Sequence, residues 1–267
     1  MTSSAKSSNW LFYPEPNAHA KLRLLCFPYA GGRSSVFGGW QEWLPSEVEL
    51  CCVQLPGRDA NRFEPLFTSF DSLMEALVPV VGEACTLPLT FFGHSMGALI
   101  CFEVARELRV RNWPSPVQMF LSGHRAPHQS MSETPLHCLP DAHFVRELQR
   151  RYGETQDFLQ SPELTELFLP LLRADLSVCE SYRYRTAEPL DSPFFVLGGA
   201  QDRRVRRVHL SAWRAHTRGP FQLRVLPGDH FYIRNAQSLL APILRLQLRR
   251  VLDQLSRGTI EDLYRAG

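Results

Sequence analysis

Residues 93–97, Gly-His-Ser-Met-Gly, place one serine between two glycines. This G-x-S-x-G pattern is typical of a nucleophilic serine on a sharp strand-to-helix turn, where side chains at the glycine positions would collide with neighbouring backbone. The pattern alone is weak, because an ordinary glycine-rich turn into a helix also satisfies it. Here a strand-like apolar run, residues 89–92, precedes the serine, and a helix-like run, residues 96–109, follows it. The context therefore favours Ser95 as a nucleophile.

A serine hydroxyl needs a base within hydrogen-bond reach and an acid that orients the base. In hydrolases with this turn, the chain order is serine, acid, histidine. Asp202 follows one strand-like run, and His230 lies in the loop after the next, so both are expected at the carboxyl edge of a sheet. His230 is the only histidine placed in this way after the acid. We predict that His230 is the base and Asp202 the acid, with Asp175 as the alternative acid.

The tetrahedral intermediate of acyl transfer needs two backbone N–H donors for its oxyanion. One is expected from the residue after the nucleophile, Met96, and the other from an early strand-to-helix loop. The segment CFPYAGG, residues 26–32, fits that loop, because its glycines let the backbone turn sharply and approach a ligand. Spacing alone does not indicate which of its N–H groups points inward.

The elements that must position these residues alternate between short apolar runs and longer amphipathic ones. This alternation predicts an α/β fold with a mostly parallel sheet flanked by helices. The expected strands are Leu22–Phe27, Val48–Gln54, Leu89–Phe92, Val117–Leu121, Phe194–Leu197 and Leu223–Leu226. The expected helices are Val36–Leu44, Ser69–Ala84, Met96–Arg109, Arg204–His216 and Ser238–Leu255.

One connection is much longer than the others, since about seventy residues separate the strands that end at Leu121 and begin at Phe194. Such a length exceeds an ordinary βα connection and predicts an inserted helical lid over residues 125–188. The lid would cover the carboxyl edge, where open α/β folds bind ligands. Its apolar helical faces, which include Phe168 and Leu172, are expected to line an acyl channel, with plain coverage of the core as the alternative. With this insertion, residues 1–267 are expected to form one α/β domain.

Composition excludes several other classes of protein. With 44% hydrophobic residues, 21% charged residues and a net charge of +2, the chain is typical of a soluble globular protein without nucleic-acid binding. No apolar stretch indicates export or membrane spanning, so we expect a cytoplasmic protein. No metal site is expected, because the cysteines are scattered through apolar runs without a C-x-x-C pair, as reduced core thiols are: Cys26, Cys51, Cys52, Cys85, Cys101, Cys138 and Cys179.

Several segments, in their order and spacing, resemble the type II thioesterases that accompany polyketide synthases and nonribosomal peptide synthetases. These segments are LLCFPYAGG, LPGR, FFGHSMGA, LRAD, GGAQD and LPGDHFYI, between Leu22 and Ile233. That family consists of stand-alone α/β-hydrolases related to the thioesterase of animal fatty acid synthase, so the resemblance implies that residues 1–267 form a single α/β-hydrolase domain. One departure is Asp229, where the family often has a second glycine before the catalytic histidine.

Carried over residue by residue, the resemblance implies Ser95 as nucleophile, Asp202 as acid, His230 as base, and the N–H groups of Ala30 and Met96 as oxyanion donors. It implies acyl groups on the phosphopantetheine arm of an acyl or peptidyl carrier protein as substrates. No cofactor is needed for this chemistry, and we expect a monomer. The arginines of DRRVRR, residues 202–207, would face an acidic carrier, although a solvated helical face explains them equally well.

Two other functions remain open on the sequence. An esterase or lipase acting on free oxygen esters would use the same triad, although the chain lacks an HGGG-type loop. A catalytically silent module that docks on a synthase would need none of the three catalytic groups, and all three are present.

Overall fold

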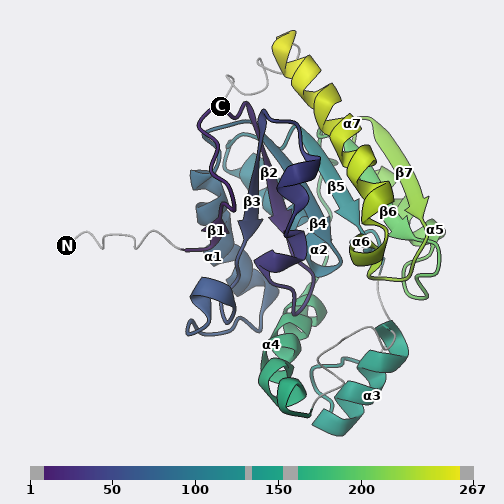
Figure 1. Ribbon diagram of the computed structural model, residues 1–267. Coiled ribbons are helices and arrows are strands. Elements are labelled where there is room, and N and C mark those ends of the chain that lie inside the picture. Colours follow the sequence, from purple (N-terminus) through teal and green to yellow (C-terminus); the bar gives the residue numbers. More distant parts are fainter. Residues whose placement is uncertain (1–8, 130–133, 153–161, 259–267) are drawn as a thin grey trace.

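The computed structural model describes residues 9–129, 134–152 and 162–258 (Figure 1). Its centre is a seven-stranded sheet in the order β1-β3-β2-β4-β5-β6-β7, in which β1 pairs antiparallel and the other pairings are parallel. This arrangement confirms the predicted mostly parallel α/β sheet. The strands are β1 (Leu11–Phe12), β2 (Leu22–Phe27), β3 (Val48–Val53), β4 (Leu89–His94), β5 (Gln118–Ser122), β6 (Phe194–Gly199) and β7 (Phe221–Leu226).

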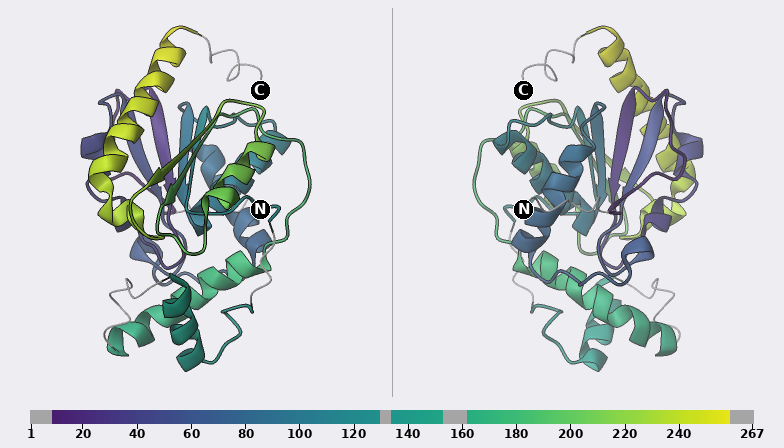
Figure 2. Two further views of the ribbon diagram at one scale, coloured as in Figure 1. Left: turned by 90° about the vertical axis from the view of Figure 1, so that its right-hand side faces the viewer. Right: turned by 90° about the vertical axis from the view of Figure 1, so that its left-hand side faces the viewer.

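Helices cover both faces of the sheet (Figures 1 and 2). On one face, α1 (Phe70–Glu83), α2 (Met96–Val110) and α5 (Arg207–Ser211) share a core with the strands. On the other face, α6 (Tyr232–Asn235) and α7 (Gln237–Ser256) form a second core with two 3₁₀ segments near the N-terminus. Every residue of the strands β2 to β6 is buried, because a parallel sheet between two helical layers has no solvent-facing side.

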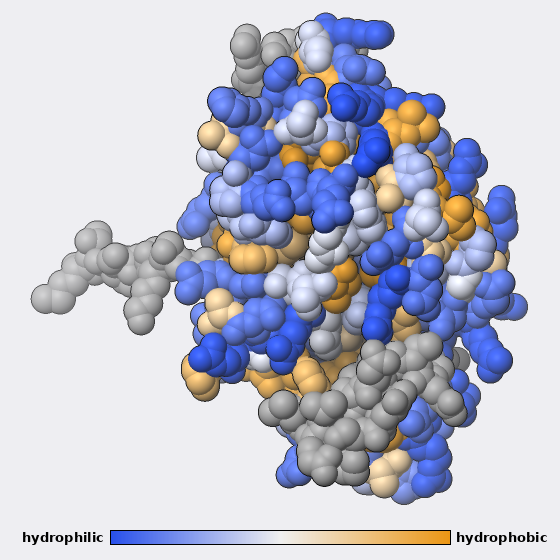
Figure 3. All heavy atoms as spheres, in the orientation of Figure 1, coloured by the Kyte–Doolittle hydropathy of each residue, from blue (hydrophilic) through white to orange (hydrophobic). Residues whose placement is uncertain are grey.

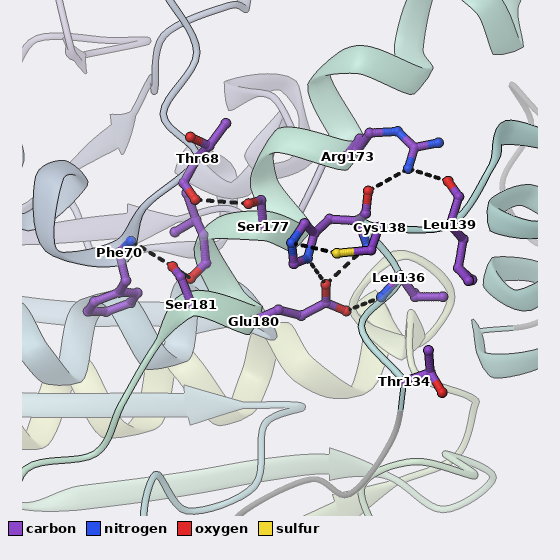
Figure 4. Close-up of polar contacts among 12 residues, drawn as sticks. Thr68, Phe70, Thr134, Leu136, Cys138, Leu139, Arg173, Ser177, Glu180 and Ser181 are labelled. Atoms are coloured by element: carbon purple, nitrogen blue, oxygen red, sulfur yellow. Dashed lines mark hydrogen bonds and ion pairs between the residues drawn. The ribbon is translucent and has the colours of Figure 1, made fainter.

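Among its described residues, the connection between β5 and β6 carries α3 (Asp141–Tyr152) and α4 (Pro162–Ser181), which lie beyond one end of the sheet (Figure 1). Helix α4 is tied to the body: the Ser177 hydroxyl donates to the Thr68 carbonyl at 2.9 Å, and the Phe70 N–H donates to the Ser181 hydroxyl at 2.9 Å (Figure 4). The segment before α3 is bound to α4, because the Leu136 N–H donates to the Glu180 carboxylate at 2.7 Å. Helix α4 therefore joins the insertion to the start of α1.

Two sequence expectations for the fold were wrong, and one strand was missed. Residues 36–44 lie in two 3₁₀ segments, Ser34–Phe37 and Trp40–Trp43, because the chain turns between them at Gly39, whose φ is +76°. The helix expected from residue 204 begins only at Arg207, and its second half, Ala212–His216, is 3₁₀. Strand β1 was missed, since two residues are too few to show a period.

The cysteines match the expectation of core thiols only in part. Cys26, Cys51, Cys52 and Cys101 are free and buried, and burial raises the pKa of the Cys51 thiol to about 12, so that it stays protonated. Cys138 is exposed instead.

The face shown in Figure 3 is mostly hydrophilic, with apolar side chains in small separate groups. Over the described part of the chain, no helix combines the length and the apolar character needed to span a bilayer.

Candidate active site

Ser95 occupies a strained turn between β4 and α2. Its φ of +54° and ψ of −119° lie outside the regions that L-residues ordinarily adopt. The flanking glycines make the turn possible, because a Cβ at Gly93 would lie 2.2 Å from the Gly97 carbonyl oxygen, and one at Gly97 would lie 2.0 Å from the Phe27 carbonyl oxygen. The Ser95 N–H donates to the Ser122 carbonyl of the neighbouring strand at 2.8 Å. The G-x-S-x-G pattern thus has the strand, turn and helix that it requires.

A continuous hydrogen-bond chain connects Ser95, His230 and Asp202. His230 Nε2 lies 3.0 Å from Ser95 Oγ, and His230 Nδ1 lies 2.7 Å from Asp202 Oδ2. An ionised carboxylate can only accept, so Nδ1 carries the proton and Nε2 is free to accept the serine proton. The structure therefore brings the three sequence-predicted residues into hydrogen-bond contact.

The Asp202 carboxylate is held by backbone as well as by His230. Its Oδ1 accepts the N–H groups of Arg204 at 2.8 Å and Val205 at 3.0 Å. Burial by itself raises the pKa of Asp202, but the hydrogen bonds and the charge interaction with His230, and the two backbone N–H groups, outweigh it, so the pKa lies below its ordinary value. The carboxylate is consequently ionised at neutral pH.

The loops that follow β6 and β7 are bound to each other at the carboxyl edge. The Gln201 N–H donates to the Gly228 carbonyl at 2.9 Å, and a Cβ at Gly199 would lie 2.2 Å from the Asp229 carbonyl oxygen. The glycine is therefore needed for the two loops to approach. The Asp229 carboxylate accepts the Phe231 N–H at 2.8 Å.

The alternative acid, Asp175, lies elsewhere. It stands on α4 and forms a buried, bidentate ion pair with Arg58, with N–O distances of 2.7 and 2.9 Å. The same carboxylate accepts the Gly31 N–H at 2.7 Å. Asp202, and not Asp175, therefore contacts His230. The sequence contained both partners of this pair, in LPGR and LRAD, but nothing in their spacing showed that they meet.

Both expected oxyanion donors lie beside Ser95. Met96 is the first residue of α2, and N–H groups in the first turn of a helix have no partner within the helix. Ala30 lies in a turn in which the Gly32 N–H donates to the Tyr29 carbonyl at 2.7 Å. Ala30, Met96 and Ser95 line the same cavity.

Two aromatic contacts around His230 could not be foreseen from the sequence. Tyr152, the last residue of α3, places its ring 5.2 Å from the His230 ring, and the Arg204 guanidinium lies 4.7 Å from the Tyr152 ring. On the buried side, the His94 ring lies 5.3 Å from that of His230. Burial keeps the pKa of His94 well below its ordinary value, so His94 is neutral. These contacts join elements distant in sequence, for which local pattern gives no signal.

A cavity of about 510 Å³ opens beside Ser95, between the sheet edge and the inserted helices. This volume is in the range of small-molecule binding sites. Its apolar and aromatic lining includes Leu99, Leu136, Leu148, Tyr152, Leu172, Leu176, Cys179 and Tyr184. Leu172 thus contacts the cavity as expected, whereas Phe168 lies under the guanidinium of Arg33, 5.1 Å from its ring, and is not part of the lining.

The family model of the thioesterase domain matches residues 22–246. The chain belongs to the thioesterase family. The thioesterase is 39% identical over 252 residues to the gramicidin S biosynthesis protein GrsT of Aneurinibacillus migulanus, covering 94% of this chain and 98% of the relative. The predicted family resemblance is thereby confirmed.

Solved structures agree with this assignment. RedJ, a thioesterase from the prodiginine biosynthetic pathway in Streptomyces coelicolor, superposes with a TM-score of 0.82 at 38% identity, covering 88% of the present thioesterase and 94% of RedJ. YbtT, a type II thioesterase from the yersiniabactin NRPS/PKS biosynthetic pathway, superposes with a TM-score of 0.75 at 34% identity, covering 88% and 97% of the two chains. The thioesterase has the α/β-hydrolase fold, as predicted.

Proposed function

We propose that this thioesterase hydrolyses acyl thioesters on the phosphopantetheine arm of carrier proteins and releases aberrant or stalled acyl groups. The single observation that carries the proposal is the Ser95–His230–Asp202 hydrogen-bond chain at the edge of a large, mostly apolar cavity. Similarity to enzymes of peptide and polyketide biosynthesis over nearly the whole chain supports the choice of substrate.

In the proposed reaction, His230 Nε2 accepts the proton of Ser95 while the serine oxygen attacks the thioester carbonyl. The N–H groups of Met96 and Ala30 stabilise the oxyanion of the tetrahedral intermediate. The intermediate collapses to an acyl-serine, and the phosphopantetheine thiolate leaves and takes the proton from His230. Water, activated by the same imidazole, then hydrolyses the acyl-enzyme. Asp202 holds the imidazole in the required tautomer throughout.

The inserted helices serve in this proposal as a lid within a single domain. The cavity that contains Ser95 is also lined by Leu148 and Tyr152 of α3 and by Leu172 and Leu176 of α4. An acyl chain bound there would lie against apolar side chains with its carbonyl carbon near Ser95 Oγ. The cavity would thus select acyl groups by length and shape.

The partner in this proposal is an acidic carrier protein that approaches over the loop following β6. Arg203, Arg206 and Arg207 are exposed there, next to Asp202. Arg204 differs, because it is half-buried, lines the cavity and packs on Tyr152. Three rather than four of the arginines in DRRVRR therefore belong to the proposed docking surface.

Hydrolysis measured by mass spectrometry on a panel of acyl carrier and peptidyl carrier proteins tests the function. We expect kcat/KM for acyl-carrier substrates to exceed that for p-nitrophenyl esters of the same acyl groups by at least about tenfold, because electrostatic steering and carrier contacts add to binding. Faster turnover of the aryl esters would favour the esterase alternative. Ser95 that does not react with a fluorophosphonate would favour the silent docking module.

A further inference from the structure

The buried ion pair between Arg58 and Asp175 contacts two backbone groups of the turn that contains Ala30, one on each side of the Gly31–Gly32 peptide. The Asp175 carboxylate accepts the Gly31 N–H at 2.7 Å, and Arg58 Nη1 donates to the Gly32 carbonyl at 3.0 Å. Arg58 is 1% exposed and Asp175 is 4% exposed, so water does not compete for these contacts. The turn is thus held by Asp175 from α4 and by Arg58 from the loop after β3.

The turn itself has little freedom. The Gly32 N–H donates to the Tyr29 carbonyl, and Gly31, the third of the four residues, has the positive φ that a type II turn requires at that position. On the outer side the turn packs against α4, since a Cβ at Gly31 would lie 3.2 Å from the Leu172 side chain. The N–H of Ala30, one residue earlier, is therefore held by the same contacts.

Charge balance explains why the carboxylate is paired. The Asp175 carboxylate binds the residue next to the expected oxyanion donor, and an uncompensated negative charge there would oppose the oxyanion that forms during attack. The guanidinium of Arg58 cancels this charge while its second nitrogen completes the bidentate contact.

We infer that Arg58 and Asp175 are positioning residues for the oxyanion hole, which hold the Tyr29–Gly32 turn so that the Ala30 N–H points at the tetrahedral intermediate. This inference rests on the proposed function of Ser95. It assigns a role to the LPGR and LRAD segments, and it makes α4 a support of the oxyanion hole as well as a wall of the cavity.

Two double variants separate positioning from stability. Arg58→Met with Asp175→Leu removes both charges and both contacts with the turn. Arg58→Gln with Asp175→Asn removes the charges but keeps an acceptor for the Gly31 N–H. The matched control is the buried pair Arg23–Glu49, 2.8 Å apart, which lies near the amino ends of β2 and β3, replaced by Arg23→Met with Glu49→Leu.

The readouts are kcat and KM for an acyl-N-acetylcysteamine, inhibition by an alkylboronic acid that forms a tetrahedral serine adduct, and binding of a non-hydrolysable acyl thioether. For the apolar double variant we expect kcat and boronate affinity to fall together by about 10- to 100-fold, a part of the loss seen on removing a whole oxyanion donor. KM and thioether affinity should change less than about threefold, because they report ground-state binding. The amide double variant should recover most of kcat, and the control pair should lower only the melting temperature.

An apolar double variant that folds and keeps kcat within about threefold of wild type would overturn the inference, as would equal losses of boronate and thioether affinity. If that variant does not fold, Asp175→Glu is used instead, because it displaces the carboxylate and keeps the ion pair. A ratio of boronate affinity to thioether affinity that equals the wild-type ratio would then overturn the inference. Failure of the proposed function would give a different result: the wild-type protein would react with fluorophosphonate but would not hydrolyse acyl thioesters. The same comparison can then be made with a p-nitrophenyl ester.

Discussion

Replacing Asp202 with asparagine should reverse the tautomer of His230, and the structure shows why. Oδ1 of Asp202 accepts two backbone N–H groups, while Oδ2 accepts the imidazole Nδ1–H. In the asparagine side chain only one oxygen remains, and the two N–H donors retain it. The amide nitrogen must then donate to His230 Nδ1, which places the ring proton on Nε2, facing Ser95. In that tautomer the imidazole cannot accept the serine proton.

The expected loss in kcat is about 10³- to 10⁴-fold, the size seen when a triad acid becomes its amide, which corresponds to about 4 to 5.5 kcal/mol of activation free energy. The assay is release of free thiol from an acyl-N-acetylcysteamine under saturating substrate, with melting temperature as the check on folding. Asp229→Asn is the matched control: it neutralises the neighbouring carboxylate, whose contact is with the Phe231 N–H, and should keep kcat within about threefold. A loss below tenfold in Asp202→Asn, or a larger loss in Asp175→Asn, would refute the assignment of the acid.

Ser95→Ala should leave the melting temperature near that of wild type and abolish hydrolysis, so a tenth of wild-type kcat in this variant would contradict its role as nucleophile. Reversing the charge of Arg203, Arg206 and Arg207 together should raise KM for acyl-carrier substrates about tenfold at low salt and less at higher salt, and should leave the turnover of acyl-N-acetylcysteamine unchanged. The control is the same charge reversal at the exposed Arg249, Arg250 and Arg257, towards and at the C-terminal end of α7. An equal rise in KM for the two triple variants would contradict electrostatic steering by the first group. Leu172→Trp should shift chain-length preference toward shorter acyl groups, as measured by kcat/KM across an acyl series, whereas Phe168→Leu should mainly lower the melting temperature because Phe168 does not line the cavity. Because the pKa of Asp202 is lower in the folded than in the unfolded state, its ionised carboxylate stabilises the fold at pH values above the unfolded-state pKa, and this stabilisation is lost as the pH falls through the folded-state pKa. Below about pH 4, the free energy of unfolding should therefore fall more steeply with acidification in wild type than in Asp202→Asn, and parallel curves for the two proteins would contradict the lowered pKa.

The sheet and the contact between Ser95, His230 and Asp202 were predictable because local pattern and parallel topology both specify them. Continuous apolar runs mark strands buried on both faces, and the carboxyl ends of parallel strands meet at one edge, so residues just after β4, β6 and β7 must converge. The two glycines that flank Ser95 were informative as well, because any side chain at either position would collide with neighbouring backbone.

Hydrophobic periodicity gave the wrong start for one helix, because a side chain binds the backbone N–H groups of its first predicted turn. Periodicity indicated a helix from residue 204, but the Asp202 carboxylate takes the N–H groups of Arg204 and Val205 and delays the helix to Arg207. Pattern also carries no information on contacts between distant segments. The ring of Tyr152 above His230 depends on how α3 packs on the body, which no window of the sequence encodes.

The contacts of α4 explain why a helix of the insertion would affect the chemistry as well as access. One stretch of this helix presents Leu172 and Leu176 to the cavity and Asp175 to the turn that contains Ala30. Ser177 and Ser181, further along the same helix, bond to the backbone of Thr68 and Phe70. If Asp175 positions the Ala30 N–H as we infer, an acyl group that contacts Leu172 also contacts the helix that orients this donor. In such an arrangement, the fit of the acyl chain affects the free energy of the transition state as well as that of substrate binding, because one helix is both a wall of the cavity and the support of the oxyanion hole.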